Sequence, residues 1–236
     1  MKRFVVLAAA LLALVAVAPQ AWADTISITS VDGTWTNAVP AGVTIDNSGT
    51  PRTARWGTPA ESGQSGYNFT PNNPGTVTVD GGAFLLGTFV HVNYPITGTS
   101  LTSIDLNFTL DWANFLPDIN GAFSFSHEET PNSTPCTYPS VTPCADRVTV
   151  TSPFLNTNIS YGGNTYYFTL LGFSQDGGVT TDSHFITQED QLNSAGLYGT
   201  LTSIPLPPPT VPEPTSLLLL GFGLVGVARA WRKRRA

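Results

Sequence analysis

The chain has 236 residues and a formal net charge of −6, with 41% hydrophobic and 11% charged residues. Seven of its ten basic residues lie in the first three or the last eight positions, so residues 24–204 carry three arginines, fifteen acidic residues and a net charge of −12. This excess of negative charge argues against nucleic acid as a partner, because phosphates require basic side chains for neutralisation. It suits a soluble surface protein, or one that collects divalent cations.

The first 23 residues have the three parts of a secretory signal peptide. Lys2 and Arg3 form the positive start, Phe4–Ala18 is an apolar run, and residues 21–23 (Ala-Trp-Ala) form a cleavage site between small residues. A first transmembrane helix is the alternative, but the apolar run is short for a membrane span. We therefore expect export through the Sec translocon and a mature protein that begins at Asp24.

Residues 24–204 are rich in Gly, Thr, Ser, Asn and Pro, and they lack long helical periodicity. Short segments of alternating apolar and polar residues recur instead, at 25–29, 76–79, 103–110, 147–150 and 166–171. Such segments, bounded by turn residues, predict an all-β fold with a single antiparallel β-sandwich that is jelly-roll-like. The sandwich would lie between the signal peptide and a C-terminal transmembrane helix. Within it, the one candidate helix is Thr187–Ala195.

Cys136 and Cys144 are the only cysteines, and they flank a proline-rich loop. In an exported protein, an even pair of this kind is most simply a disulfide. A metal site with two thiolates is the alternative, but it lacks nearby histidines and needs a reducing compartment. The sequence therefore predicts a Cys136–Cys144 disulfide.

The most distinctive interior segment is FLLGTFVHVNYPI, residues 84–96. In a strand, alternation places His91 and Asn93 on one face and Val90 and Val92 on the other, which we expect to be the drier face. The imidazole and the carboxamide would then stand side by side and share one neighbour or one ligand. Two interpretations remain open. We favour a pair that braces the fold, and the alternative is a binding site.

Oxygen ligands suited to Ca²⁺ occur between residues 105 and 120, without the spacing of an EF-hand loop. These residues are Asp105, Asp111, Asp118 and Asn120. Scattered surface acids are the simpler interpretation. We therefore predict no cofactor and no metal site, and Ca²⁺ is the one cation that we consider.

His127, Glu128 and Glu129 are adjacent groups capable of acid–base chemistry. A glycosidase, however, needs two carboxylates on opposite sides of a cleft. The sequence also has no HExxH spacing, nucleophile elbow or glycine-rich phosphate loop. We therefore predict no catalytic residue and no enzyme. The alternative is a secreted hydrolase that acts on polysaccharide through Glu128 or Asp111.

Residues 205–211 form a proline-rich stalk, and an apolar segment, Ser216–Ala230, follows it. As a helix this segment spans about 22 Å, which is short against a hydrocarbon core of about 30 Å. A basic cluster then closes the chain and would stay on the cytoplasmic side of a membrane. Its members are Arg232, Lys233, Arg234 and Arg235. A buried core helix, the alternative, would leave these four charges without a role.

Residues 212–236 resemble a PEP-CTERM sorting signal, since Pro212, Glu213 and Pro214 precede the apolar run and the arginine-rich end. The resemblance implies processing by an exosortase, a transpeptidase that cuts near the Pro-Glu-Pro. It also implies a precursor anchored in the inner membrane. The mature protein would then reach the cell surface or the extracellular matrix.

Four segments also resemble the THxN family of PEP-CTERM proteins, whose body is a choice-of-anchor K domain. They are ARWG (54–57), SGYNF (65–69), the strand at 84–96 and ADRV (145–148). His91 and Asn93 match the family pattern, whereas Val90 stands where the family has threonine. No established activity comes with this resemblance. We therefore predict an exported surface or biofilm-matrix protein that is not an enzyme, with exopolysaccharide as its candidate ligand.

Overall fold

The structure, a computed structural model, describes residues 24–61, 63–113, 118–140, 143–151 and 156–206. Within these residues it has fifteen β-strands and no helix. The strands are β1 (Thr25–Val39), β2 (Thr44–Asp46), β3 (Arg52–Trp56), β4 (Thr58–Pro59), β5 (Ser65–Pro71), β6 (Thr76–Thr78), β7 (Phe84–Asn93), β8 (Ile96–Thr97), β9 (Ser103–Trp112), β10 (Ile119–Glu128), β11 (Asp146–Thr151), β12 (Thr157–Tyr161), β13 (Asn164–Ser174), β14 (His184–Thr187) and β15 (Gln191–Thr202).

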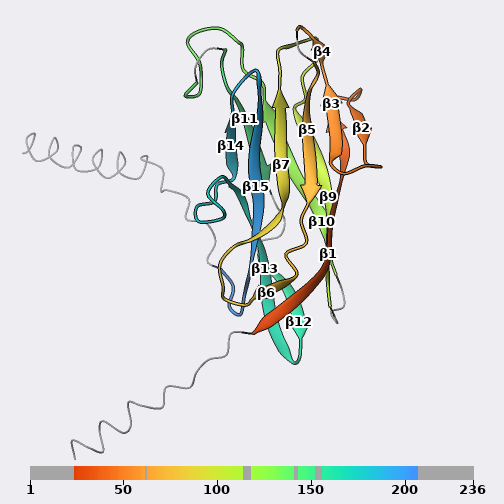
Figure 1. Cartoon of the computed structure of the whole chain (residues 1–236), viewed down its shortest axis with the longest axis vertical. Coiled ribbons are helices and arrows are strands. Elements are labelled where there is room, and N and C mark those ends of the chain that lie inside the picture. Colours follow the sequence, from red (N-terminus) through yellow and green to blue (C-terminus); the bar gives the residue numbers. More distant parts are fainter. Residues whose placement is uncertain (1–23, 62, 114–117, 141–142, 152–155, 207–236) are drawn as a thin grey trace, which may run out of the picture. The chain divides into compact units, whose positions relative to one another are not determined.

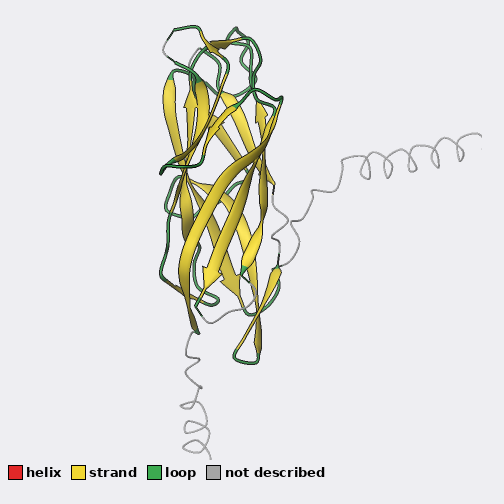
Figure 2. Cartoon of the chain, turned by 90° about the vertical axis from the view of Figure 1, so that its right-hand side faces the viewer, coloured by secondary structure: helices red, strands yellow, loops and turns green. Residues whose placement is uncertain are grey.

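Two antiparallel sheets contain most of these strands and pack against each other (Figures 1 and 2). One sheet has the order β14-β11-β10-β9-β1-β6, and the other has the order β12-β13-β15-β7-β5-β3-β2. A short separate ladder joins β4 to β8. The predicted all-β, sandwich-like fold is therefore confirmed, while its jelly-roll-like connectivity stays a prediction.

The core lies between the two sheets and is built by alternation along each strand. In β9, Ile104, Leu106, Phe108 and Leu110 are buried, while the residues between them point outward. A period of two is what a strand with one buried face requires. The largest fully buried side chains are mostly aromatic: Trp35, Tyr67, Phe69, Phe89, Phe108, Phe123, Phe125 and Phe168.

The helix expected over Thr187–Ala195 is wrong. Thr187 ends β14, residues 188–190 form a turn, and β15 begins at Gln191. Asn193 closes this turn, because its Oδ1 accepts from Gln188 N at 2.7 Å and its Nδ2 donates to Gln188 O at 2.8 Å. Strand β15 also pairs with β7 and β13 along its length. These ladders to distant strands outweigh the weak local preference for a helix.

The signal peptide (1–23) and the sorting segment with its transmembrane helix (212–236) lie outside the described residues. Of the stalk predicted at 205–211, only Pro205 and Leu206 are described. Among the described residues, no helix is long and apolar enough to cross a membrane.

Candidate functional site

Strand β7 presents His91 and Asn93 to the interior, together with Phe89. All three side chains are fully buried, whereas Val90 is only half-buried. The expectation that the valine face is the drier one is therefore wrong. Both faces of β7 are apolar enough to be buried, so hydrophobicity alone did not distinguish them. Val90, the position that departs from the THxN pattern, lies on the face away from His91 and Asn93.

Around His91 and Asn93 lies a group of polar side chains contributed by both sheets, which we call the core polar cluster. Strand β7 supplies the members that come from the seven-stranded sheet. The other members come from the six-stranded sheet: from β10, β11 and β14, and from the short segments that follow β10 and β14. The cluster consists of His91, Asn93, His127, Glu129, Asp146, Thr187 and Glu189. All but Glu129 are at most 7% exposed.

Thr187 is the hydrogen-bond partner of one nitrogen of His91, since its Oγ1 lies 2.8 Å from Nδ1. The Thr187 hydroxyl can donate to Asp146 O at 3.4 Å, and in that arrangement its oxygen accepts from His91 Nδ1. His91 Nδ1 is then the protonated nitrogen, and Nε2 carries a lone pair. His91 Nε2 is buried and has no hydrogen-bond partner among the described residues.

Among the described residues, two further side chains are held at one atom and unpartnered at another, and a third, Glu189, is unpartnered at both oxygens. Asn93 Nδ2 donates to Thr187 O at 3.2 Å, which leaves Asn93 Oδ1 buried without a partner. Asp146 Oδ1 accepts from the backbone N–H of Thr130 at 2.8 Å, which leaves Asp146 Oδ2 without one. Both carboxylate oxygens of Glu189 are also buried and unpartnered in the described part of the chain. Unpartnered buried polar atoms are rare, so each one requires an explanation.

His127 completes the cluster from the opposite sheet. Its Nδ1 lies 2.7 Å from Tyr67 Oη, and its Nε2 lies 3.2 Å from Glu129 Oε2. The rings of His91 and His127 are 5.0 Å apart and perpendicular. Trp56 stacks on His91 with a centroid distance of 5.9 Å, so an aromatic wall closes this side of the cluster.

Burial shifts the pKa of several cluster groups. Burial, followed by the nearby charge of Glu129, raises the pKa of Asp146 and that of Glu189 to about 7. Burial, followed by repulsion from His127, lowers the pKa of His91 well below its usual value. At neutral pH the histidine is therefore uncharged, and each carboxyl is divided between its two protonation states.

The cluster atoms converge closely enough to act on one small ligand. One nitrogen of His91, one nitrogen of His127 and one oxygen of Asp146 lie within 4.8 Å of one another. A second set with the same limit comprises carboxylate oxygens of Glu129, Asp146 and Glu189. Asp146 belongs to both sets, so it is the centre of the cluster.

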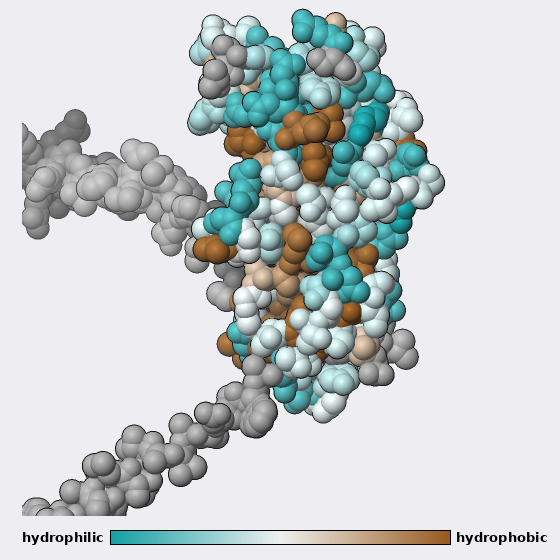
Figure 3. Space-filling model, viewed as in Figure 1, coloured by the Kyte–Doolittle hydropathy of each residue, from teal (hydrophilic) through white to brown (hydrophobic). Residues whose placement is uncertain are grey.

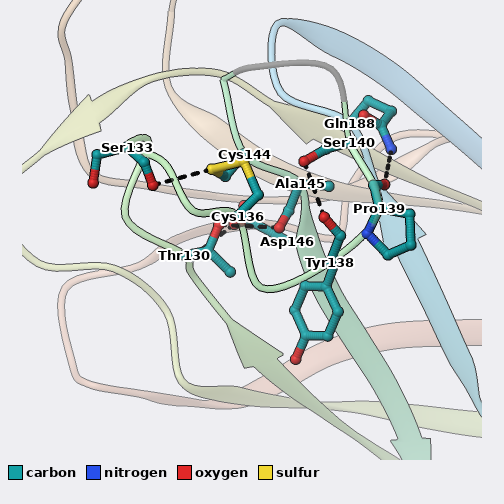
Figure 4. The surroundings of a disulfide bond; sticks show 10 residues. All are labelled: Thr130, Ser133, Cys136, Tyr138, Pro139, Ser140, Cys144, Ala145, Asp146 and Gln188. Atoms are coloured by element: carbon teal, nitrogen blue, oxygen red, sulfur yellow. Dashed lines mark hydrogen bonds between the residues drawn. A yellow bond between two sulfur atoms is a disulfide. The ribbon is translucent and has the colours of Figure 1, made fainter.

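The predicted disulfide is present and lies directly beside the cluster (Figure 4). Cys136 and Cys144 are bonded, and Cys144 leads through Ala145 to Asp146. Thr130 Oγ1 donates to Ala145 O at 3.0 Å, which ties the start of the disulfide loop to its end. Gln188 Nε2 donates to Pro139 O at 3.3 Å, which joins the loop to the turn that carries Glu189.

The four residues considered for Ca²⁺ do not converge on one point. Asp105 and Asp111 are six residues apart on strand β9, a separation of about 20 Å. Asp105 accepts instead from Ser124 Oγ at 2.7 Å and from Asn37 Nδ2 at 2.9 Å. Asp111 accepts from the hydroxyl of Ser30. Asp118 and Asn120 lie at the start of β10, so one ion cannot contact all four residues.

Alternation separates the three adjacent acid–base groups at the end of β10. His127 and Glu129 belong to the cluster, whereas Glu128 points outward and pairs with Arg147 at 2.7 Å. Sequence reasoning missed Asp146, although a signal was available. Asp146 alternates in step with Val148 and Val150 along β11, and all three side chains point into the interior of the sandwich. An acid in the apolar phase of a strand marks a buried charge that needs a partner.

Aromatic rings can stack on sugars, but the large aromatic residues of this chain are mostly core residues. Trp35, Trp56, Trp112 and Tyr67 are at most 4% exposed. They therefore present no flat ring to solvent.

The C-terminal residues 210–235 match the PEP-CTERM protein-sorting motif. The match covers the predicted signal residues Pro212, Glu213, Pro214, Arg232, Lys233, Arg234 and Arg235. Among curated proteins, none matches this sequence. The resemblance of residues 24–204 to the THxN family stays a prediction. The motif implies an exported precursor that is anchored in the membrane and processed by an exosortase on its way to the cell surface.

Proposed function

We propose that the mature body is a non-enzymatic component of the cell surface or the extracellular matrix. The observation that carries this proposal is the sorting motif at residues 210–235, downstream of the predicted secretory signal peptide. The charge of the body is consistent with it, because a strongly acidic domain stays soluble and does not bind polyanions. The surface face in Figure 3 is also mostly polar, with small separate apolar groups.

Two features support a role without catalysis. The core polar cluster is sealed, since His91 and Asp146 are fully buried and a polysaccharide cannot reach them. The two acids considered for a hydrolase are also engaged elsewhere. Glu128 pairs with Arg147, and Asp111 accepts from Ser30.

The proposed ligand is exopolysaccharide, bound in a hollow between the end of β13 and the start of β14. The hollow has a volume of about 460 Å³. Gln175, Asp182 and His184 are among the polar residues on its wall. Amides, carboxylates and imidazoles hydrogen-bond the hydroxyl groups of sugars.

Affinity chromatography on the producing cell's own polysaccharide tests this proposal. The processed wild-type protein should be retained, and the double variant Gln175→Ala/His184→Ala should elute early. Gln64→Ala is the matched control, because Gln64 lines a different hollow beside Trp56. Equal elution of all three proteins contradicts the polysaccharide proposal. Release of reducing sugar from the column would instead favour the secreted hydrolase.

A further inference from the structure

The core polar cluster contains acceptor atoms that have no donor. His91 Nε2, Asn93 Oδ1, Asp146 Oδ2 and both oxygens of Glu189 are buried and unpartnered among the described residues. The amides of Asn93 and Asn132 face Glu189, but neither makes a hydrogen bond of ordinary geometry with it. Leaving so many acceptors unsatisfied in a core would be costly, because each loses its hydration without compensation.

The rest of the structure orients these atoms. Thr187 Oγ1 accepts the Nδ1 proton of His91, and the backbone carbonyl of Thr187 accepts from Asn93 Nδ2. The backbone N–H of Thr130 fixes the other oxygen of Asp146. A second hydrogen bond that fixes the tautomer and the direction of a side chain is typical of metal ligands.

His127 can join the same centre through its own second hydrogen bond. Tyr67 Oη lies 2.7 Å from His127 Nδ1 and can accept its proton. When a cation replaces the Nε2 proton, which otherwise points at Glu129 Oε2 3.2 Å away, His127 Nε2 carries the lone pair. One nitrogen of each histidine and an oxygen of Asp146 already lie within 4.8 Å of one another, so one ion can contact all three.

A cation also compensates the carboxylate charge that the cluster gathers. Glu129, Asp146 and Glu189 form a set of carboxylates within 4.8 Å, and no arginine or lysine belongs to the cluster. Two imidazole nitrogens together with carboxylate oxygens favour a divalent first-row transition metal over Ca²⁺, which takes oxygen ligands only. Zn²⁺ suits a closed, structural site of this composition.

We propose that the core polar cluster binds one divalent transition-metal ion, with Zn²⁺ as the best match. His91, His127 and Asp146 are its ligands, and Glu189 lies in the adjoining set of carboxylates around Asp146. Thr187 and Thr130 are positioning residues. The ion bridges the two sheets, because β7 belongs to one and β10 and β11 belong to the other. This site is independent of the proposed polysaccharide hollow, which shares none of these residues.

The test uses the processed protein, unfolded in guanidinium with a chelator and refolded with or without Zn²⁺. Elemental analysis should find one Zn²⁺ per chain. The melting temperature should rise by roughly 5–15 °C when free Zn²⁺ is 100 to 1,000 times the dissociation constant. A large excess of Ca²⁺ should not displace the Zn²⁺.

His91→Ala and Asp146→Asn should each lose the bound Zn²⁺, while His184→Ala and Glu128→Gln, the surface controls, should keep it. Cobalt loading of the wild type provides a measurement that needs no variant. With Co²⁺ in the site, proton NMR should show two strongly shifted, exchangeable signals from the Nδ1–H groups of His91 and His127. The proposal fails if the wild type binds no Zn²⁺, if both cluster variants retain it, if Ca²⁺ is preferred, or if the shifted signals are absent.

Discussion

At the scale of single residues, the cluster shows what burial does to polar side chains. When they are ionised, Asp146 and Glu189 carry charges that the interior does not solvate. The hydrogen bond from Thr130 compensates only part of that penalty for Asp146. His91 avoids the same penalty by staying neutral. Without a cation, this group of side chains is therefore a weak point of the fold.

Replacing Glu189 with Gln should stabilise the metal-free protein in a way that depends on pH. The raised pKa of Glu189, about 7 against 4.5, means that folding disfavours its charged form. The wild type therefore loses stability as pH rises from about 4.5 to about 7. In a chelator, Glu189→Gln should be more stable than the wild type by about 2 kcal/mol at pH 8 and equally stable below pH 4.5. Urea unfolding at both pH values measures this difference.

The charges that face Glu189 are those of Glu129 and Asp190, and the amides of Asn93 and Asn132 partly offset them. Glu61→Gln is the matched control, because Glu61 is exposed and is not among the charges that face Glu189. A Glu189→Gln effect of the same size at pH 4.5 and pH 8 would show that charge is not the cause. With Zn²⁺ present, the difference should shrink, because the ion compensates the charge of the carboxylates around Asp146.

Sequence reasoning found His91 and Asn93 as a pair but could not determine which face they occupy. Phe89 makes their face apolar, and Val90 and Val92 make the other face equally apolar. The decisive contact, Thr187, is 96 residues from His91 in the chain. Glu189 lies in a turn, where no periodicity marks a buried position. These contacts depend on the pairing of distant strands, so local patterns carry no signal for them.

At the scale of elements, the alternation of apolar and polar residues predicted strands correctly where one face of the strand is buried and the other is exposed to solvent. Ser103–Trp112 is such a strand, and the segment 103–110 was expected within it. The expected helix at Thr187–Ala195 failed for the opposite reason. That segment has few apolar residues, and its conformation is determined by Asn193 and by the neighbouring strands β7 and β13.

Removing the disulfide should destabilise the loop that connects β10 to β11. Cys136→Ala/Cys144→Ala should lower the free energy of unfolding by about 2–3 kcal/mol, because the bond restricts the unfolded chain. The same variant should release Zn²⁺ faster, since Cys144 is two residues from Asp146 and the loop contacts Gln188. Urea unfolding and transfer of Zn²⁺ to a chromophoric chelator measure the two effects.

Thiol labelling provides the control for the disulfide prediction. The wild type, denatured without reductant, should show no reactive thiol. Two labelled cysteines would mean that the bond does not form in the exported protein. Unchanged stability of the alanine variant would mean that the loop is held by its hydrogen bonds alone.

At the scale of the whole molecule, the acidic and basic residues lie in different parts of the chain. The body from 24 to 204 has a net charge of −12, and the basic residues gather at the two ends. Removing both ends would leave an acidic domain with a surplus of carboxylates. Divalent cations are expected to accumulate around such a domain. A buried site that binds one ion tightly and a surface that attracts ions loosely are compatible features of the same molecule.

Processing is the prediction that concerns the complete chain. Mass spectrometry of the surface fraction should find a mature protein that begins at Asp24 and ends near Pro214, because the sorting motif covers residues 210–235. A variant lacking residues 212–214 should keep its basic end and remain with the membrane fraction. The matched control removes residues 207–209 of the stalk and should be processed normally. An intact Trp231 on most wild-type molecules would show that the segment acts as a permanent anchor, with the body held at the membrane.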